Sequence, residues 1–286
     1  MTRIPDPDIE PASSLARAST TPTSIPGEIS TVAAMQIAAD HFHASLNTSP
    51  IALQHIGWRG KVARELIEYF QLGLSDNTLS ARTGESRALR LELGRIGLIR
   101  TNGDERFAGS FVVPVTNATG EVVQLRGGEY HVVTGRSTNE RFFPHEVDAV
   151  FNVRGLAVSE ELIIAPTAMD VLRFWYAGHV NITALGEGLA LTDGHLAAMK
   201  RAGTRRVVLA LGVGGKSDAI AIAAAGRLVG AGISTYRATI GRRFMPTSRQ
   251  WGQSIREAKP MLGAPARPEP PQLDLDWSRV PKKESR

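Results

Sequence analysis

The sequence predicts an α/β protein in which a subdomain with a mostly parallel sheet follows a subdomain of the α+β type. In the second half of the chain, strand-like and helix-like segments alternate with short connections, which is typical of parallel strands covered by helices on both faces. In the first half, apolar residues recur at helical spacing and then give way to two apolar runs around a turn. The 286 residues are enough to bury a sizeable core.

Residues 31–98 favour helices because apolar residues return every three or four positions. These residues are Met35, Ile37, Ala38 and Phe42, then Val62, Leu66, Ile67 and Phe70, then Leu89, Leu93 and Ile96. From 107 to 133 the pattern changes to that of strands. The apolar runs 111–115 and 121–125 flank a turn at 117–120 that contains Asn and Gly, so this part predicts a β-hairpin.

The second half predicts a repeated strand–helix unit. Strands are expected at 161–165, 180–184, 206–211 and 233–240, with helices at 168–176, 192–202 and 217–228. Thr192 and Asp193 supply an N-cap for the second of these helices. In such a fold, ligands bind beyond the carboxyl ends of the strands.

The two ends of the chain differ from the middle in composition. Residues 1–30 are rich in Pro, Ser and Thr with few large apolar side chains, which predicts a disordered N-terminal tail. Residues 251–286 are basic and contain several prolines, and we expect a C-terminal tail there. Between the tails, we expect the α+β subdomain to span 31–155 and the α/β subdomain to span 156–250.

Composition narrows the functional classes. The chain has no cysteine, which excludes disulfides and cysteine-ligated zinc and fits a reducing compartment. No apolar run approaches the roughly 18 residues of a membrane-spanning helix, and the N-terminus lacks the apolar core of a secretory signal. A net charge of +5 makes polyanions plausible partners. We therefore expect a cytoplasmic protein with no membrane partner.

A glycine-rich loop joins the third strand of the second half to the helix that follows it. Gly212, Gly214, Gly215, Lys216 and Ser217 could hold a phosphate, because glycines expose backbone N–H groups and the lysine adds attraction. The loop is not a full P-loop, since an alanine stands where that motif needs its first glycine. A tight strand-to-helix turn with a solvated lysine is the alternative interpretation.

Several stretches, taken in chain order, resemble one known family. They are residues 57–74, 97–99 followed by 111–128, 163–172, 185–188 with 191–192, and 207–218. The stretch 111–128 includes Pro114, Gly120 and the pair Gly127 and Gly128. This series is similar to the RNA-polymerase core of DnaG-type bacterial DNA primases, which contains a Toprim domain. The resemblance implies a Rossmann-like Toprim subdomain preceded by a primase-like α+β subdomain. It does not include the zinc-binding domain that usually precedes this core.

The chain departs from the family at its metal-binding acids. The family motif Glu-Gly-x-x-Asp after the first strand is replaced by a stretch from Pro166 to Asp170, and the motif Asp-x-Asp after the third strand is replaced by Gly212 and Gly214 around a valine. In the family, these acids hold the divalent cations that organise nucleotide phosphates. Asp170 is thus the only retained family acid, and Pro166, Gly212 and Gly214 occupy the other acidic positions.

The resemblance implies Mg²⁺ as the family cofactor, and we expect its binding here to be weak or absent. Glu187, in the loop after the second strand, would lie near Asp170 in this fold and could help it to hold one cation. A solvated loop position is the favoured interpretation for Glu187, because metal sites need several converging ligands. His41 and His43 lie on a predicted helix and would point apart, which favours structural roles for both.

Basic residues form two groups that we predict to bind nucleic acid rather than to be merely solvated. One group is Arg237, Arg242, Arg243 and Arg249, interleaved with aromatic residues that could stack on bases. The other is Arg126, Arg136 and Arg141, which flank the hairpin where the resemblance places the template.

Three functions fit these observations. The first is a DNA-primase-like replication protein of plasmid, phage or mobile-element type, which is catalytically degenerate. It would act by binding a single-stranded DNA or RNA template, a replicative helicase or an intact primase. The second is an active DNA primase, a nucleotidyltransferase that makes RNA primers with an altered metal site. The third is a phosphate- or nucleotide-sensing module built on the glycine-rich loop.

Overall fold

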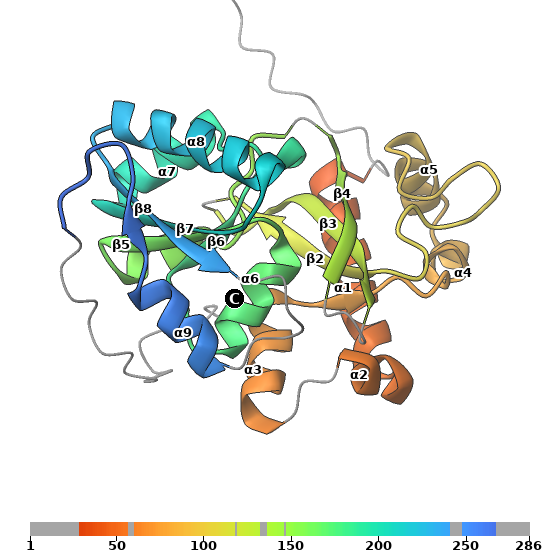
Figure 1. The fold of residues 1–286 in the computed structure, drawn as a ribbon. Coiled ribbons are helices and arrows are strands. Elements are labelled where there is room, and N and C mark those ends of the chain that lie inside the picture. Colours follow the sequence, from red (N-terminus) through yellow and green to blue (C-terminus); the bar gives the residue numbers. More distant parts are fainter. Residues whose placement is uncertain are drawn as a thin grey trace, which may run out of the picture.

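The fold consists of two sheets, each with its own set of helices (Figure 1). The computed structural model describes residues 29–56, 60–117, 119–131, 136–145, 147–240 and 248–266. The first sheet is antiparallel, with strand order β1-β2-β3-β4, and the second is mostly parallel, with order β6-β5-β7-β8-β9. The predicted α/β class with a mostly parallel sheet is confirmed.

The antiparallel sheet is built from β1 (Gly73–Leu74), β2 (Phe111–Thr116), β3 (Val122–His131) and β4 (Arg136–Phe143). β2 and β3 form the predicted hairpin, with Phe111 opposite Gly128 and Val115 opposite Gln124. Gly127 is required by a close approach, since a Cβ there would lie 2.4 Å from the ring of Phe107.

Helices cover this sheet as the apolar spacing predicts. They are α1 (Thr31–Asn47), α2 (Pro50–Ile56), α3 (Gly60–Phe70), α4 (Leu79–Arg82) and α5 (Arg87–Arg95), with a 3₁₀ turn η1 (Thr83–Glu85) between the last two. The side chain of Ser30 caps α1 by accepting the Ala33 N–H at 3.2 Å. α1 then buries Met35, Phe42 and Leu46 against its neighbours.

The mostly parallel sheet contains β5 (Glu161–Ala165), β6 (Ile182–Ala184), β7 (Arg206–Gly212), β8 (Ser234–Ile240) and β9 (Lys259–Pro260). Its helices are α6 (Ala168–Tyr176), α7 (Asp193–Ala202), α8 (Gly215–Gly230) and α9 (Ser248–Arg256). There are also two 3₁₀ turns. η2 (Val153–Val158) precedes β5, and η3 (Glu187–Leu189) follows β6. α7 and α8 lie on one face of the sheet, and α6 and α9 lie on the other (Figure 1).

Alternate residues of the central strands enter separate cores on the two faces. In β7, Val208 and Ala210 pack with residues of α6, while Val207 and Leu209 pack with residues of α7 and α8. A strand that is buried on both faces must be apolar throughout, which is why its run could be recognised from the sequence.

The predicted C-terminal boundary is wrong. The tail was expected from residue 251, but α9 continues to Arg256, and β9 pairs antiparallel with β8 at the edge of the sheet. Ile255 and Ala258 are buried there, so this segment has enough apolar surface to pack. Residues 1–28 and 267–286 lie outside the described residues.

The two subdomains share one apolar core. The ring of Tyr69 in α3 stacks on Trp175 of α6 with 5.3 Å between centroids, and Phe70 stacks on Phe151 at 5.4 Å. The predicted boundary at residue 155 falls within η2, beside this contact. None of the helices in the described ranges combines the length and the apolar character needed to cross a bilayer.

The predicted nucleic-acid contact of Arg126 is wrong because its side chain is buried between the subdomains. Arg126 is 1% exposed and donates hydrogen bonds to the carbonyl oxygens of Leu185 (3.0 Å) and Ala149 (3.3 Å). Its guanidinium also lies 4.9 Å from the ring centroid of Phe142. Arg126 therefore links β3 to the loop that follows β6.

We predict that Arg126→Met lowers the free energy of unfolding by roughly 3–5 kcal/mol, because it leaves buried carbonyl acceptors unsatisfied. Urea unfolding followed by circular dichroism measures this change. The control is Arg205→Met, since Arg205 is 74% exposed and pairs with Glu160 at the surface. The control should change stability by less than about 0.5 kcal/mol. Equal small effects of both substitutions would contradict the structural role of Arg126.

Candidate functional site

The candidate site lies where β5, β6 and β7 end. β5 is the neighbour of both other strands, and all three run parallel, so the loops that follow them meet at one edge of the sheet. Each loop leads into a helical segment, namely α6 after β5, η3 and α7 after β6, and α8 after β7. The side chains of these loops and of β4 decide what this edge can bind.

Asp170, which the sequence resemblance identifies as a family acid, is engaged in the first turn of α6. One carboxylate oxygen accepts a hydrogen bond from Arg173 at 2.9 Å, and the other accepts one from the Thr167 hydroxyl at 2.8 Å. Thr167 in turn caps α6 by accepting the Asp170 N–H at 3.1 Å. Pro166 offers no ligand atom in its side chain. The segment that the resemblance aligns with the first acidic motif thus forms a helix cap and an ion pair.

A carboxylate that the sequence analysis missed lies beside this cap. Glu140 projects from β4, and its Oε1 accepts the N–H of Ala168, the first residue of α6, at 2.8 Å. Burial raises the pKa of Glu140 to about 7, although the charge of Arg126 and the Ala168 N–H act to lower it. No motif marks this position, because it is the pairing of β3 with β4 that brings it to the edge of the other sheet.

Glu187 lies further out, on η3. Its Oε1 is 2.7 Å from Nδ1 of His145, and both side chains are about half exposed. Of the described residues, Glu140, Asp170 and Glu187 do not form a group with ligand atoms close enough to hold a metal ion, and the group that does so lies in the other subdomain. The expected help of Glu187 to Asp170 in holding a cation is therefore not seen in this geometry.

The glycine-rich loop forms the third part of the edge. Gly214 is the N-cap of α8 and has φ 110° and ψ 162°, a conformation that is essentially confined to glycine. Gly212 ends β7, and a Cβ there would meet only the Ser217 hydroxyl at 3.5 Å. Gly215 and Lys216 are exposed at the start of α8. An aspartate could thus replace Gly212 with little strain, but not Gly214.

Arg237, predicted to bind nucleic acid, is instead paired within this loop. From β8 it donates hydrogen bonds to the carbonyl oxygen of Gly212 at 2.9 Å and to a carboxylate oxygen of Asp218 at 2.6 Å. Its side chain is only 19% exposed. Asp218 lies in the first turn of α8, where its negative charge already complements the helix dipole. Phosphate binding by the loop remains a prediction.

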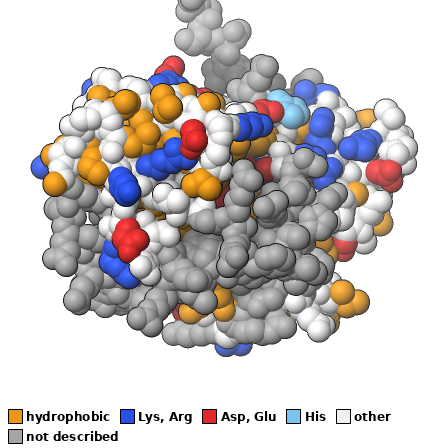
Figure 2. All heavy atoms as spheres, in the orientation of Figure 1, with side chains coloured by type: hydrophobic (Ala, Val, Ile, Leu, Met, Phe, Trp, Pro, Cys, Tyr) orange, Lys and Arg blue, Asp and Glu red, His pale blue; other side chains and the backbone are white. Residues whose placement is uncertain are grey.

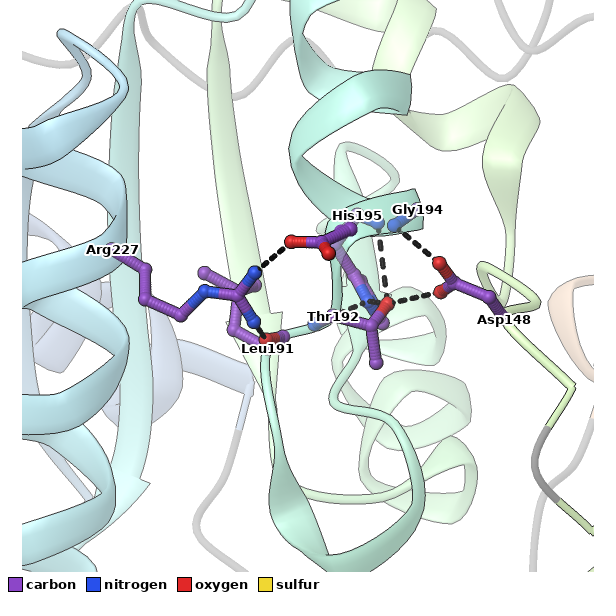
Figure 3. Close-up of polar contacts among 7 residues, drawn as sticks. Asp148, Leu191, Thr192, Gly194, His195 and Arg227 are labelled. Atoms are coloured by element: carbon purple, nitrogen blue, oxygen red, sulfur yellow. Dashed lines mark hydrogen bonds and ion pairs between the residues drawn. The ribbon is translucent and has the colours of Figure 1, made fainter.

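A dense polar network fixes the second loop at the start of α7 (Figure 3). Thr192 caps the helix, and its N–H donates to Nδ1 of His195 at 3.2 Å, while Nε2 of His195 lies 2.9 Å from the carbonyl oxygen of Ala184. Asp148 accepts hydrogen bonds from the Thr192 hydroxyl and from the Gly194 N–H. Burial lowers the pKa of His195, which favours the neutral imidazole whose Nδ1 accepts the Thr192 N–H. The network holds the loop, and the side chains of Asp148, Thr192 and His195 are all engaged in it.

Arg227 joins the network from the other side. From α8 it contacts the carbonyl oxygen of Leu191 and the carboxylate of Asp193 (Figure 3). α7 and α8 are thereby tied together at the edge where the strands end.

Of the remaining arginines predicted to bind nucleic acid, the structure describes the side chain of Arg141. Arg141 is half-buried and donates hydrogen bonds to the carbonyl oxygen of Arg106 at 3.1 Å and to the Ser110 hydroxyl, so it is engaged inside the subdomain. Arg136 lies in β4 and Arg249 in α9, but their side chains lie outside the described part. Arg242 and Arg243 lie outside the described residues altogether.

A different basic surface was missed by the sequence analysis. Exposed arginines gather on α4, α5 and the turn after α5, and we call this set the α4–α5 basic surface. It consists of Arg82, Arg87, Arg90, Arg95 and Arg100. Figure 2 shows blue Lys and Arg side chains gathered on the lobe where Figure 1 places α5. The available signal was the charge on the outer face of a helix whose inner face carries Leu89 and Leu93.

Several solved structures with the same architecture are catalytic or RNA polymerase domains of primases. The fold is similar to a DnaG primase catalytic domain bound to ssDNA, with TM-score 0.64 and 19% sequence identity over 80% of this chain and 79% of that chain. It is similar to the Escherichia coli primase catalytic core, with TM-score 0.62 and 20% identity over 81% of each chain. No protein-family model and no curated protein matches the chain.

The RNA polymerase domain of Mycobacterium tuberculosis primase DnaG, in complex with double-stranded DNA, is similar as well. Its TM-score is 0.62, with 17% identity over 80% of this chain and 81% of that chain. At these identities the likeness establishes the fold. This chain has the fold of DnaG-type primase catalytic cores, as its sequence resemblance predicts.

We predict that Glu140→Gln changes how stability depends on pH. The folded pKa of about 7 lies above the ordinary 4.5, so the folded state keeps a proton that the unfolded state has already lost. The contribution of Glu140 to the free energy of unfolding is fully present below pH 4.5. It falls as the pH rises towards 7 and is lost above pH 7. Relative to the variant, the wild type should lose about 1–3 kcal/mol of unfolding free energy between these limits.

Urea unfolding of both proteins at several pH values measures this difference. Glutamine keeps the oxygen that accepts the Ala168 N–H, so the substitution isolates the ionisation. The control is Glu160→Gln, which removes a carboxylate that is 53% exposed. A difference between wild type and Glu140→Gln that stays constant from pH 4.5 to about pH 8 would contradict the assignment.

Proposed function

We propose that this protein is a DNA-primase-like protein linked to DNA replication that binds nucleic acid but synthesises no primers. The observation that carries the proposal is a primase-type fold whose acidic positions hold Pro166, Gly212 and Gly214, while the retained Asp170 is paired with Arg173. A replication protein of plasmid, phage or mobile-element type fits this combination.

The residues present do not fit the magnesium ions that the family implies. Mg²⁺ needs hard oxygen ligands in near-octahedral geometry, and glycine and proline side chains supply none. Both oxygens of Asp170 accept hydrogen bonds from neighbouring side chains. Burial raises the pKa of the Glu140 carboxyl, which lies beside α6, to about 7, so a proton competes with a cation for this group near neutral pH. We therefore derive no metal-dependent step for this chain.

Two observations support nucleic-acid binding, namely the exposed arginines of the α4–α5 basic surface and the similar solved structures. The α4–α5 basic surface presents several exposed guanidinium groups, which suit a phosphate backbone. Among the similar structures, one primase domain is bound to ssDNA and another to double-stranded DNA. We propose a single-stranded DNA or RNA template as the partner, with a replicative helicase or an intact primase as the protein that recruits it.

A second candidate function rests on the glycine-rich loop. Gly215 and Lys216 are exposed at the start of a 16-residue helix, which favours a phosphate- or nucleotide-sensing module. The paired Asp218 and Arg237 in the same turn weaken this candidate, because Asp218 already places a negative charge there. Calorimetry with nucleotides and pyrophosphate tests it.

We predict no template-directed primer synthesis with either Mg²⁺ or Mn²⁺. The measurement is incorporation of labelled nucleotides on single-stranded templates, with an intact DnaG-type primase as the positive control. Product at a hundredth of the control rate would contradict the proposal and favour an active primase with an altered metal site. That factor corresponds to only about 2.7 kcal/mol, far less than the loss of two catalytic metal ions should cost.

We further predict that the protein binds single-stranded DNA weakly, without strong sequence preference, and with an affinity that falls steeply as salt increases. The double substitution Arg87→Glu, Arg90→Glu should weaken binding about tenfold or more. It should also reduce the salt slope by about one unit for each phosphate that the variant no longer neutralises. Fluorescence anisotropy at several salt concentrations measures both quantities.

The matched control is Arg201→Glu, Arg205→Glu, which reverses two exposed charges around the C-terminal end of α7. It should change the affinity much less. The variant Arg242→Glu, Arg243→Glu tests the basic group expected from the sequence. Binding that is independent of salt, or equal in all variants, would favour a protein partner over nucleic acid.

A further inference from the structure

Three ligand-type side chains converge in the antiparallel subdomain, far along the chain from the family acids. They are His41 on α1, Asp76 after β1 and Glu105 before β2. One nitrogen or oxygen of each lies within 4.8 Å of the others. Among the described residues, this is the group of His, Asp and Glu side chains with the spacing of a metal site.

His41 and His43, two positions apart in the sequence, make different contacts in the structure. Nδ1 of His43 lies 2.9 Å from the carbonyl oxygen of Leu72, so His43 has a structural role, as predicted. His41 faces the other way, and its Nε2 lies 2.9 Å from the hydroxyl of Thr78. The expectation that the two imidazoles point apart is confirmed, but His41 finds its partners on other segments.

Glu105 is a buried carboxyl group whose hydrogen-bond donors are neutral. The residue is 1% exposed, and its carboxylate accepts hydrogen bonds from the Leu79 N–H at 2.6 Å and from the Ser75 hydroxyl. No Lys or Arg of the described chain forms an ion pair with it. Buried carboxylates are normally compensated by a paired cation or by a metal ion.

The surroundings add negative charge rather than removing it. Asp76 is exposed beside Glu105, and Asp104 is the preceding residue in the same loop. Burial lowers the pKa of His41, with Arg82 acting in the same direction, although both carboxylates raise it. An imidazole nitrogen and the carboxylate oxygens of the two acids are all ordinary metal ligands, and here they lie within 4.8 Å of one another.

We propose that His41, Asp76 and Glu105 bind one divalent transition-metal ion, with Zn²⁺ as the best match. Imidazole nitrogen and carboxylate oxygen are both ordinary ligands of Zn²⁺, and three protein ligands leave a position for water. Mg²⁺ and Ca²⁺ prefer ligand sets made only of oxygen, so the imidazole disfavours them.

The Thr78 hydroxyl occupies a bridging position in the structure as described. It donates to Asp76 at 2.6 Å and lies 2.9 Å from the His41 nitrogen. When the metal binds, His41 exchanges this hydroxyl for the ion, and the hydroxyl keeps its bond to Asp76.

The metal would act as a clamp within the subdomain. It would join α1, the turn that starts α4 and the loop before β2, three segments that are far apart in sequence. Because Glu105 also holds the first N–H of α4, the clamp would stabilise the base of the α4–α5 basic surface. The inference does not depend on whether the protein binds nucleic acid.

The test is a calorimetric titration of the metal-free full-length protein with ZnCl₂, together with elemental analysis of the protein after dialysis. We expect one Zn²⁺ per chain, a rise in the melting temperature, and no comparable response to MgCl₂ at the same concentration. Co²⁺ as a probe should give visible absorption bands that change when the imidazole is removed.

Two variants test the ligands without touching the buried carboxylate. His41→Ala and Asp76→Asn alter residues that are not buried, and each should weaken Zn²⁺ binding by roughly tenfold or more. The control is His145→Ala, which removes an exposed imidazole paired with Glu187 on the opposite side of the junction and should leave Zn²⁺ binding unchanged. Far-ultraviolet circular dichroism establishes that each variant is folded.

The proposal is overturned if the folded wild type binds no Zn²⁺ at about 1 mM metal, the weak limit of specific affinity. It is also overturned if His41→Ala and Asp76→Asn bind Zn²⁺ as tightly as the wild type. In that case the cluster is a hydrogen-bonded support for the start of α4.

Discussion

The burial of one guanidinium group constrains the whole junction between the subdomains. Arg126 cannot lose its proton, and burial lowers its pKa without neutralising it, so the fold must surround it with acceptors. The carbonyl oxygens of Leu185 and Ala149 supply two of these, and Gln124 supplies a third. Because Leu185 directly follows β6, the antiparallel sheet and the carboxyl edge of the other sheet are held in one arrangement.

That arrangement explains why the acids at the edge have protein partners. Asp170 pairs with Arg173 within α6, whereas Asp218 pairs with Arg237 and Asp193 with Arg227 between two neighbouring elements. Asp148 holds the start of α7, and Glu140 holds the start of α6. Charges that would need cations in a metal-dependent enzyme are compensated here by arginines and helix N-termini.

The helices and strands that are buried on both faces could be predicted from the sequence. Elements and side chains whose positions depend on tertiary contacts could not. The strand Glu161–Ala165 and the helix Ala168–Tyr176 match their predicted ranges because the strand is continuously apolar and the helix has a clear cap. β9 pairs only two residues, so its alignment depends on β8 and not on any local pattern.

Single side chains were harder to predict than elements. Arg126 and Arg141 look like surface residues in a sequence, since nothing local distinguishes a buried arginine from an exposed one. The position of Glu140 depends on the pairing of β3 with β4 and on the packing of two sheets. The α4–α5 basic surface was visible as charge, but the resemblance to primases favours the hairpin and the last strand instead.

The two groups of acidic residues differ in whether an arginine pairs with each carboxylate. At the carboxyl edge of the mostly parallel sheet, Asp170 and Asp218 each pair with an arginine, so no cation is needed to stabilise them. In the antiparallel subdomain, Glu105 is buried, accepts hydrogen bonds from neutral donors, and lies beside another acid and an imidazole. The buried carboxylate without a basic partner among the described residues therefore lies in the antiparallel subdomain. The metal ion that we propose there would stabilise this subdomain.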